Sequence, residues 1–398
     1  MSMKKPKIRF KGYMDDWEQR KVGKFLTESR ESGHKGDVAH KMTVKLWGKG
    51  VYEKNDVGSA NTQYFIRHAR QFIYSKLDFL NCAFGVVPEE LESLETTADV
   101  PAFDCDGVNP YFMFYTAIQP NFYEKNGMIA DGSRKAKRIH VDIFLDMPFI
   151  VPGLEEQNKI VNLLSTLDHL ITLHQRKCNQ AKKLKKYMLQ KMFPQNGEKN
   201  PEIRFDGFTD DWEQRKLGDV CSRVQGNDGR MELPTLTISA GNGWMRQEER
   251  FSGNIAGKEQ KNYTLLHKGE LSYNHGNSKL AKYGTVFSLQ TYEEALVPRV
   301  YHSFRVEKGS ADFVEYYFVT KLPDRELGKL ISSGARMDGL LNIGFDEFMG
   351  ITLMFPEDQE QERIATCFRQ LDHLITLHQR KCDEMKKIKK FMLQNMFV

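Results

Sequence analysis

Two histidine–cysteine pairs are the residues of this 398-residue chain whose spacing first suggests chemistry. His174 and Cys178 are one helical turn apart, and so are His378 and Cys382, so each pair would share one face of a helix. Two imidazoles and two thiolates are a zinc-ligand set. They meet only if the two helices run parallel, because in an antiparallel pair the cysteines would lie roughly 12 Å apart by helical rise. Polar residues that fix the register of a helix pair are the favoured interpretation, and no metal is expected.

The sequence lacks the short motifs of common enzymes. It contains no phosphate-binding Gly-x-x-x-x-Gly-Lys-Ser/Thr, no dinucleotide-binding Gly-x-Gly-x-x-Gly after a strand and no His-Glu-x-x-His, and it has no Gly-x-Ser-x-Gly elbow. The stretch Asn109-Pro-Tyr-Phe112 is similar to the Asn-Pro-Pro-Tyr loop of amino-methyltransferases, but the second proline is missing. A turn that leads into an aromatic helix is the preferred prediction there, and no catalytic residue is predicted.

Polar and basic residues suited to DNA gather in the middle of each half of the chain. Arginine suits guanine, asparagine suits adenine, and lysine suits phosphate. An ordinary polar loop explains any one of these residues, so their clustering at matching places in both halves carries the prediction. The candidate DNA-binding residues are Arg67, Arg70, Lys76, Arg134, Lys135 and Arg138 in the first half, and Asn242, Trp244, Tyr273, Asn274, His275, Asn277, Lys279, Lys282 and Arg336 in the second.

Composition favours a globular cytoplasmic protein. Apolar residues make up 40% of the chain and charged residues 28%, which excludes a disordered chain. The formal net charge of +5 is a mild excess of basic residues. It is compatible with nucleic-acid binding but does not by itself indicate it. The six cysteines form no Cys-x-x-Cys pair, as expected for reduced thiols. No apolar run reaches membrane-spanning length, and the basic first ten residues lack the apolar core of a signal peptide.

The chain consists of two halves that repeat each other in three layers. The opening segment 8–21, with its Asp-Asp-Trp-Glu-Gln-Arg-Lys ending, returns at 203–216, and the twelve residues 167–178 return unchanged at 371–382. More weakly, 64–76 resembles 263–275, where alternating apolar and polar residues predict strands. The ends of each half are nearly identical while the middles have diverged. This pattern indicates a constant frame that holds two variable inserts.

Most of the frame is predicted to be two long helices. From Leu154 to Phe193 the sequence has no Pro or Gly, an acidic first turn and a cationic end, and about forty helical residues would span roughly 60 Å. Apolar residues at heptad spacing form a narrow seam that two such helices would bury against each other. An antiparallel pairing is favoured because it places His174 and His378 near the shared midpoint; the alternative is that each helix packs only on its own domain. The predicted pairing residues are Ile160, Leu163, Leu167, Leu170, His174, Ile364, Leu371, Leu374 and His378.

The predicted fold class is α+β. Two mixed α/β domains, at 1–151 and 195–355, are separated by two long helices, at 152–194 and 356–398. The helices pair as an antiparallel coiled coil, and the whole forms a pseudo-twofold internal repeat.

This arrangement resembles the specificity subunit of type I restriction-modification systems. The resemblance rests on two variable domains, each followed by a long helix that begins with Pro…Glu-Gln…Ile and continues into Leu-Asp-x-Leu-Ile, at 152–171 and 356–375. It covers essentially the whole chain. One difference between the halves is that the basic segment 132–138 has only Arg336 as a counterpart in 334–343.

The resemblance implies that each variable domain is a target-recognition domain that reads one half of a split double-stranded DNA sequence. It implies that the helices set the gap between the half-sites, and that two methyltransferase (modification) subunits and two restriction subunits dock on the chain. S-adenosylmethionine, ATP and magnesium would belong to those partners, with no cofactor on this chain. Two other classes remain open: a self-contained DNA-modifying enzyme, and a coiled-coil scaffold that does not bind DNA.

Overall fold

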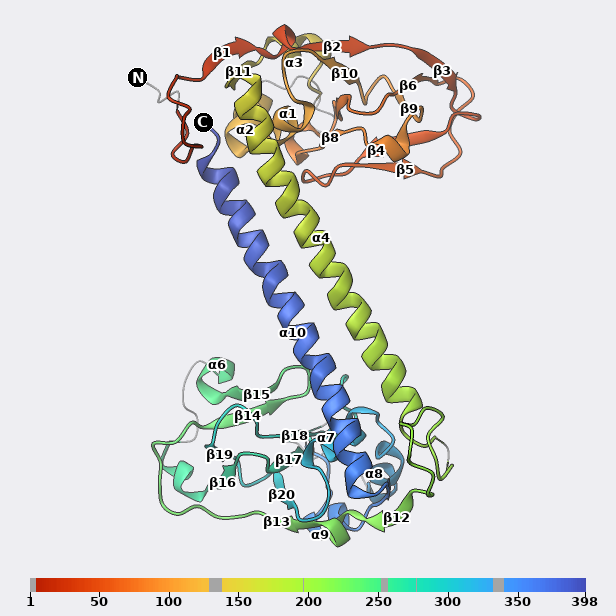
Figure 1. Cartoon of the computed structure of the whole chain (residues 1–398), viewed down its shortest axis with the longest axis vertical. Coiled ribbons are helices and arrows are strands. Elements are labelled where there is room, and N and C mark those ends of the chain that lie inside the picture. The colour runs from red at the N-terminus through yellow and green to blue at the C-terminus, as the bar shows by residue number, and fades with distance from the viewer. Residues whose placement is uncertain (1–4, 129–137, 196, 252–256, 277, 332–339) are drawn as a thin grey trace. The chain divides into compact units, whose positions relative to one another are not determined.

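The computed structural model describes residues 5–128, 138–195, 197–251, 257–276, 278–331 and 340–398. The chain divides into two compact units. One comprises Met1–Gln175 and Arg380–Val398, and the other comprises Arg176–Gln379. Each unit therefore holds one sheet-rich domain together with part of both long helices (Figure 1).

The first unit contains three sheets. A four-stranded sheet has the order β2-β10-β7-β8, a five-stranded sheet the order β3-β6-β9-β4-β5, and β1 pairs with β11. The strands are β1 (Glu18–Lys21), β2 (Leu26–Ser29), β3 (Ser32–Lys35), β4 (Lys41–Val44), β5 (Val51–Lys54), β6 (Gln63–Ile66), β7 (Phe72–Tyr74), β8 (Phe84–Val86), β9 (Glu95–Thr97), β10 (Ala102–Cys105) and β11 (Pro148–Val151).

The first unit also has short helices, most of which contribute residues to the aromatic core on the four-stranded sheet. They are η1 (Val22–Lys24), η2 (Phe79–Asn81), η3 (Glu89–Leu91), α1 (Pro110–Ala117), α2 (Pro120–Gly127) and α3 (Val141–Asp146). The expected turn into an aromatic helix is confirmed at α1, where the Asn109 side chain caps the helix by accepting from Tyr111 N. Phe112 of α1 and Phe144 of α3 are fully buried in this core.

Among its described residues, the second unit repeats the four-stranded sheet, with the order β13-β20-β17-β18, but not the five-stranded one. Two-stranded sheets β14-β15 and β16-β19 take the place of the latter, and β12 pairs with β21. The strands are β12 (Glu213–Lys216), β13 (Cys221–Arg223), β14 (Leu236–Ser239), β15 (Gly243–Arg246), β16 (Thr264–His267), β17 (Leu271–Asn274), β18 (Thr285–Ser288), β19 (Glu294–Val297), β20 (His302–Val306) and β21 (Thr352–Phe355). The short helices are α5 (Leu217–Val220), α6 (Gln247–Phe251), η4 (Gly257–Asn262), α7 (Ala311–Val319), α8 (Asp324–Leu330) and α9 (Phe345–Met349).

The strands expected in the third repeat layer are confirmed. Segment 64–76 covers most of β6 and all of β7, and segment 263–275 contains β16 and β17. β7 and β17 lie at the same place in the two four-stranded sheets. This sheet therefore belongs to the common part of the two domains, and the strands beyond it account for their divergence.

The repeated opening segment forms a strand that the sequence pattern did not reveal. β1 pairs antiparallel with β11, and β12 pairs antiparallel with β21 in the corresponding register. In each unit, the strand at the start of the domain thus lies beside the strand that leads into the long helix. The two ends of the variable insert are held together by this ladder.

The two long helices are α4 (Leu154–Lys191) and α10 (Asp358–Asn395), and each lies within the range predicted to be helical, 152–194 and 356–398. In the first unit, Asp168 of α4 bonds Lys389, and Gln175 lies against Cys382. In the second unit, Cys178 lies against Gln379, and Lys185 bonds Asp372. In both units the α10 number falls as the α4 number rises, so the antiparallel pairing and the α+β class are confirmed.

No helix in the described part of the chain is both long enough and apolar enough to span a bilayer.

Candidate DNA-recognition and docking site

A buried arginine–glutamate pair fastens the opening segment of each domain to the start of its long helix. Arg9 Nε and Nη2 donate to the two carboxylate oxygens of Glu156 at 2.7 and 2.8 Å. Arg204 makes the same fork to Glu360, with both distances 2.7 Å. The glutamate side chains are 1% and 0% exposed, so each carboxylate depends on its arginine for neutralisation. The hydrogen bond to glutamate is the main cause of a raised pKa at each guanidinium.

The glutamine beside each of these glutamates joins the helix to the insert. Gln157 accepts from Asn109 N at 2.8 Å and donates to Pro152 O at 2.9 Å. In the second unit, Gln361 accepts from Ser310 N at 3.2 Å and donates to Pro356 O at 3.0 Å. The amide has one acceptor and one donor end; the acceptor end satisfies a backbone N–H of the insert and the donor end a backbone carbonyl just before the long helix. This requirement explains why Glu-Gln recurs in both halves.

The aspartate of each repeated Leu-Asp motif joins three elements. Asp168 accepts from Tyr115 of α1 at 2.8 Å and from Lys389 of α10 at 2.5 Å. Lys389 Nζ also lies 5.4 Å above the Tyr115 ring, a cation–π distance. Burial, followed by the charge of Asp168, raises the pKa of Tyr115. The domain, its own helix and the opposing helix are thus tied at one carboxylate.

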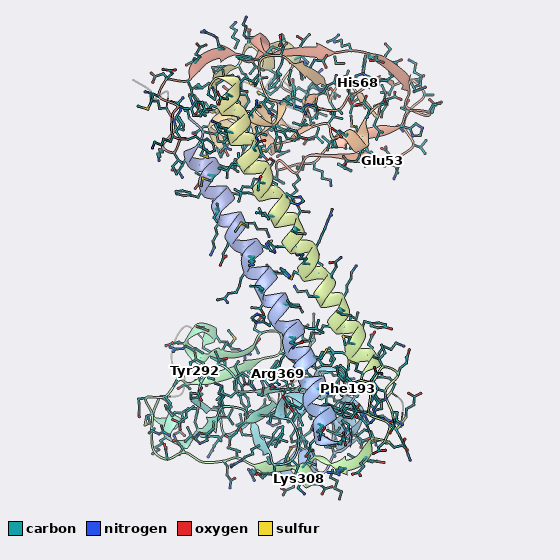
Figure 2. The ribbon with its side chains drawn as sticks, viewed as in Figure 1. Glu53, His68, Phe193, Tyr292, Lys308 and Arg369 are labelled. Atoms are coloured by element: carbon teal, nitrogen blue, oxygen red, sulfur yellow. The ribbon has the colours of Figure 1, made fainter. Side chains whose placement is uncertain are left out.

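The second unit contains the equivalent network. Asp372 accepts from Tyr316 of α7 at 2.8 Å and from Lys185 of α4 at 2.6 Å, with Lys185 Nζ 5.0 Å above the tyrosine ring. The pKa of Tyr316 is raised first by burial and then by the charge of Asp372. A further link in this unit is Arg369, labelled in Figure 2, which donates to Asp312 at 2.7 Å. Two networks with the same chemistry therefore fix the register of α4 against α10.

Removal of the Asp372 carboxylate tests this network. We expect Asp372→Ala to lower the free energy of unfolding by about 1.5 kcal/mol, because two donors lose a charged acceptor that is itself partly exposed. Glu384→Ala, an exposed carboxylate elsewhere on α10, should change stability by less than about 0.5 kcal/mol. Urea unfolding of both variants measures the difference. Equal effects would show that the network does not hold the helices.

The residues predicted to pair the helices fall into two groups. Ile160, Leu167, Ile364 and Leu371 are buried, while Leu163, Leu170, His174 and His378 are half-buried. Leu374 is 42% exposed and lies on the outer face instead. Its neighbour Ile375 takes the inner place, with its carbonyl 3.8 Å from the Cys178 sulfur. The prediction for Leu374 is corrected accordingly.

The cysteines of the two histidine–cysteine pairs pack against glutamines of the opposing helix. Cys178 Sγ lies 3.7 Å from Gln379 Oε1, and Cys382 Sγ lies 3.5 Å from Gln175 Oε1. Both thiols are buried. Among the described residues, no three His, Cys, Asp or Glu side chains are grouped so that they could hold a metal ion.

The DNA-binding candidates of the first domain separate by burial. Arg67 is 2% exposed and donates to Thr96 Oγ1 at 2.8 Å and to Ser29 O at 2.7 Å; burial lowers its pKa to about 10. Arg67 therefore links strands inside the domain. Arg70 is exposed and lines a cleft of about 470 Å³ that also contains Asp104, Asn109 and Asn158. Lys76 and Arg138 are half-buried, with Arg138 3.5 Å from Asp99, while Arg134 and Lys135 lie outside the described residues.

The second domain shows the same separation. Tyr273 is fully buried and stacks on Phe348 at 4.4 Å, and His275 bonds the carbonyls of Leu341 and Val300. These two side chains are core residues in the structure. Trp244 is half-buried and donates to Ser288 O, and Asn274 donates to Ile238 O. Exposed candidates are Asn242, at the turn between β14 and β15, and Lys279 and Lys282, while Asn277 and Arg336 lie outside the described residues.

The anchoring residues of the frame were missing from the predicted site. Arg9 and Arg204 lie in the repeated Ile-Arg-Phe, and Lys185 and Lys389 lie in the repeated lysine-rich helix ends. The repetition of these residues in both halves could therefore have identified them as part of the frame. Tyr115 and Tyr316 could not be found in this way, because they belong to the diverged part of each half.

Comparisons with known proteins agree with this frame. A family model of the type I restriction modification DNA specificity domain matches residues 209–387. The specificity subunit of the type I restriction enzyme MjaVIII from Methanocaldococcus jannaschii is 23% identical over 275 residues, or 63% of this chain; the match spans 62% of that relative's length. A type I restriction-modification S subunit from M. genitalium has the same fold, with a TM-score of 0.58 and 12% identity over 99% of both chains. The HsdS subunit from Thermoanaerobacter tengcongensis is 14% identical over 96% of both chains, with a TM-score of 0.43. Residues 209–387 thus match the type I restriction modification DNA specificity domain, and the chain as a whole shares its fold with a type I restriction-modification S subunit.

Proposed function

We propose that this chain is the non-catalytic DNA-recognition subunit of a type I restriction-modification complex. Each domain reads one half of a split, asymmetric DNA target, and the helix pair sets the number of base pairs between the halves. Two methyltransferase subunits and two ATP-dependent restriction subunits bind the chain. Methylation and cleavage, with S-adenosylmethionine, ATP and magnesium, belong to those partners.

The observation that carries the proposal is a duplicated frame around unlike inserts. The Arg–Glu fork, the Glu-Gln amide and the Tyr–Asp–Lys network occur in both units. Beyond the shared four-stranded sheet, the first insert has a five-stranded sheet where the second has two two-stranded sheets. One frame with two different inserts suits a complex that binds the same partner twice and reads two different sequences.

Exposed apolar pairs on the helices support docking of one kind of partner at two places. Leu184 and Tyr187 on α4 are 48% and 49% exposed, and Ile388 and Phe391 on α10 are 40% and 52% exposed. The second pair repeats the first at an offset of 204 residues. Residues three apart share one face of a helix, and exposed apolar patches mark interaction surfaces.

The first domain's Arg70 and the second domain's Asn242, Lys279 and Lys282 support DNA contact at the inserts. All four are exposed, so their charges and amide groups face solvent. Lysine and arginine supply phosphate contacts, and asparagine and arginine supply base contacts. Phosphate contacts of this kind make binding strongly salt-dependent.

Methylome sequencing of cells that express this chain with its methyltransferase tests the proposal. We expect methylated adenines within one two-part asymmetric motif, and none in matched cells that express the methyltransferase without this chain. Methylation by the purified chain alone with S-adenosylmethionine would instead identify a self-contained enzyme. A methylome that does not change when the chain is added would indicate instead a scaffold that does not bind DNA.

A further inference from the structure

The hairpin between β4 and β5 ends in a tip that exposes two large apolar side chains. The tip is Lys45-Leu-Trp-Gly-Lys-Gly50, and its strands lie side by side in Figure 1. Glu53, labelled in Figure 2, marks β5. Leu46 is 40% exposed and Trp47 is 61% exposed. A tryptophan this exposed leaves most of its ring without any packing partner in the domain.

The backbone of the tip is nevertheless held firmly. Lys45 N donates to Gly50 O at 2.7 Å, which closes the loop. Trp47 N donates to Asn81 O at 2.9 Å, and Gly48 N donates to Cys82 O at 2.7 Å. A Cβ added at Gly48 would lie 2.9 Å from Ile118 Cγ2, so the tip rests closely on the body of the domain. A fixed backbone with a free ring is suited to presenting that ring to a partner.

The conformation at Trp47 is strained. Its φ of 61° lies in the left-handed region, as do the φ values of Gly48 at 62° and Gly50 at 82°. Glycine adopts this region freely, whereas a bulky side chain there is an outlier. Packing within the domain does not offset the strain, because the ring is exposed. Such outliers concentrate at functional sites.

The other three tryptophans are engaged inside their units. Trp17 and Trp212 are each 2% exposed, and Trp244 is half-buried with its Nε1 donating to Ser288 O at 3.0 Å. Among the four, only Trp47 offers a ring face to an outside partner. Lys45 and Lys49 lie on either side of it, both exposed, and the six-residue tip has no carboxylate.

We propose that Leu46 and Trp47 form a wedge that inserts between stacked base pairs of the DNA bound by the first domain. This inference rests on the proposed function, because it takes duplex DNA as the partner. Apolar side chains that enter a base step unstack it and bend the duplex. The lysines on both sides of the wedge would then contact phosphates next to the opened step.

DNA fits this tip better than a docked protein does. Two adjacent side chains cover much less area than a specific protein interface requires. A protein partner that binds the chain in two copies would also need the same exposed apolar tip in both units. In the described residues of the second unit, no two consecutive residues are both large, apolar and exposed. The tip is thus a property of one insert, where sequence reading is expected to reside.

The test uses the full chain in complex with its methyltransferase, and duplexes that carry the methylated target with 2-aminopurine at successive positions of the first half-site. Wild-type complex should increase 2-aminopurine fluorescence at one base step. Trp47→Gly should abolish that increase and weaken binding about tenfold, as expected for loss of one aromatic stack. Trp47→Phe should retain most of both signals. Leu280→Ala, which removes an exposed apolar side chain from the second unit, should leave both unchanged.

Thermal unfolding separates the wedge from a structural role. Glycine accepts a φ of 61°, so Trp47→Gly should not lower the melting temperature. If the wild-type complex binds the split target and Trp47→Gly binds it equally well with the same fluorescence, the wedge is wrong and the proposed function stands. If Trp47→Gly instead loses the methyltransferase in sedimentation analysis, the tip is a protein contact. If the wild-type complex binds no split target, the proposed function fails first.

Discussion

Arg204→Ala is expected to lower the free energy of unfolding by about 3 kcal/mol, because it leaves the Glu360 carboxylate buried without its counter-charge. The carboxylate is fully buried, and both of its oxygens accept from the same guanidinium. The variant must then unfold locally, hydrate the carboxylate or protonate it, and each of these costs free energy. Urea unfolding of the full chain, followed by circular dichroism, measures the loss.

A surface pair with similar residues supplies the matched control. Arg215 pairs with Glu213 in β12, but the two side chains are 43% and 66% exposed. Arg215→Ala should therefore cost less than about 0.5 kcal/mol. The double variant Arg204→Met, Glu360→Leu should recover much of the lost stability, because apolar side chains of similar size can replace a buried ion pair. A loss at Arg204 no larger than that at Arg215 would show that the fork does not hold the frame.

The fork matters for function because it sets how each insert joins its helix. The opening strand, the strand before the helix and the helix start are all tied near Glu156 in the first unit and near Glu360 in the second. The opening segments also bond the ends of the long helices: Ile8 N donates to Asn395 O, and Ile203 N donates to Lys191 O. Phe193, labelled in Figure 2, stacks on Phe313 at 5.5 Å, and Phe397 stacks on Phe112 at 5.4 Å. Each insert is thus anchored to the long helices by the same kinds of strand pairing, hydrogen bonding and ring stacking.

The sequence was sufficient for the long helices and their direction. Forty residues without Pro or Gly, an acidic start and a heptad pattern leave few alternatives. Letter-for-letter repeats also located the Glu-Gln and Leu-Asp motifs, which the structure places at the helix start and at the helix–helix contact. These features are local or repeated, so one chain contains enough information to find them.

The inner face of the helices was harder to assign. Leu163 and Leu164 are both apolar, yet Leu164 is fully buried while Leu163 is half-buried. Each long helix packs on its domain as well as on the opposing helix, and both contacts require apolar residues. The apolar stripe is therefore wider than a coiled-coil seam. The heptad spacing of three and four residues consequently predicted Leu374, and not Ile375, as the residue that faces the opposing helix.

Residue type was the least reliable guide for the DNA-binding candidates. Arg67 and His275 have side chains that suit DNA, but their hydrogen-bonding groups are used on backbone carbonyls inside the domains. Residue type alone does not distinguish a surface donor from an internal one. Trp47 was missed because a glycine-rich stretch with two lysines resembles an ordinary turn. Its exposure and its φ are tertiary properties.

Exchange of the first insert is expected to have the largest functional effect. The β1–β11 ladder marks the boundary of the frame, so residues 22–147 can be replaced while β1, β11 and the fork remain. With the second insert untouched, the new chain should methylate a motif that has a new first half, the original second half and the original gap. The reason is that the two inserts differ beyond their shared four-stranded sheet, whereas the helix pair that we propose sets the gap is unchanged.

Methylome sequencing of this exchanged chain, expressed with its methyltransferase, tests the account most directly. We expect one half-site to change completely while the other half-site and the spacing stay as they were. Simultaneous change of both halves, or no change in either, would contradict it, because then the inserts would not be separate readers held by a common frame.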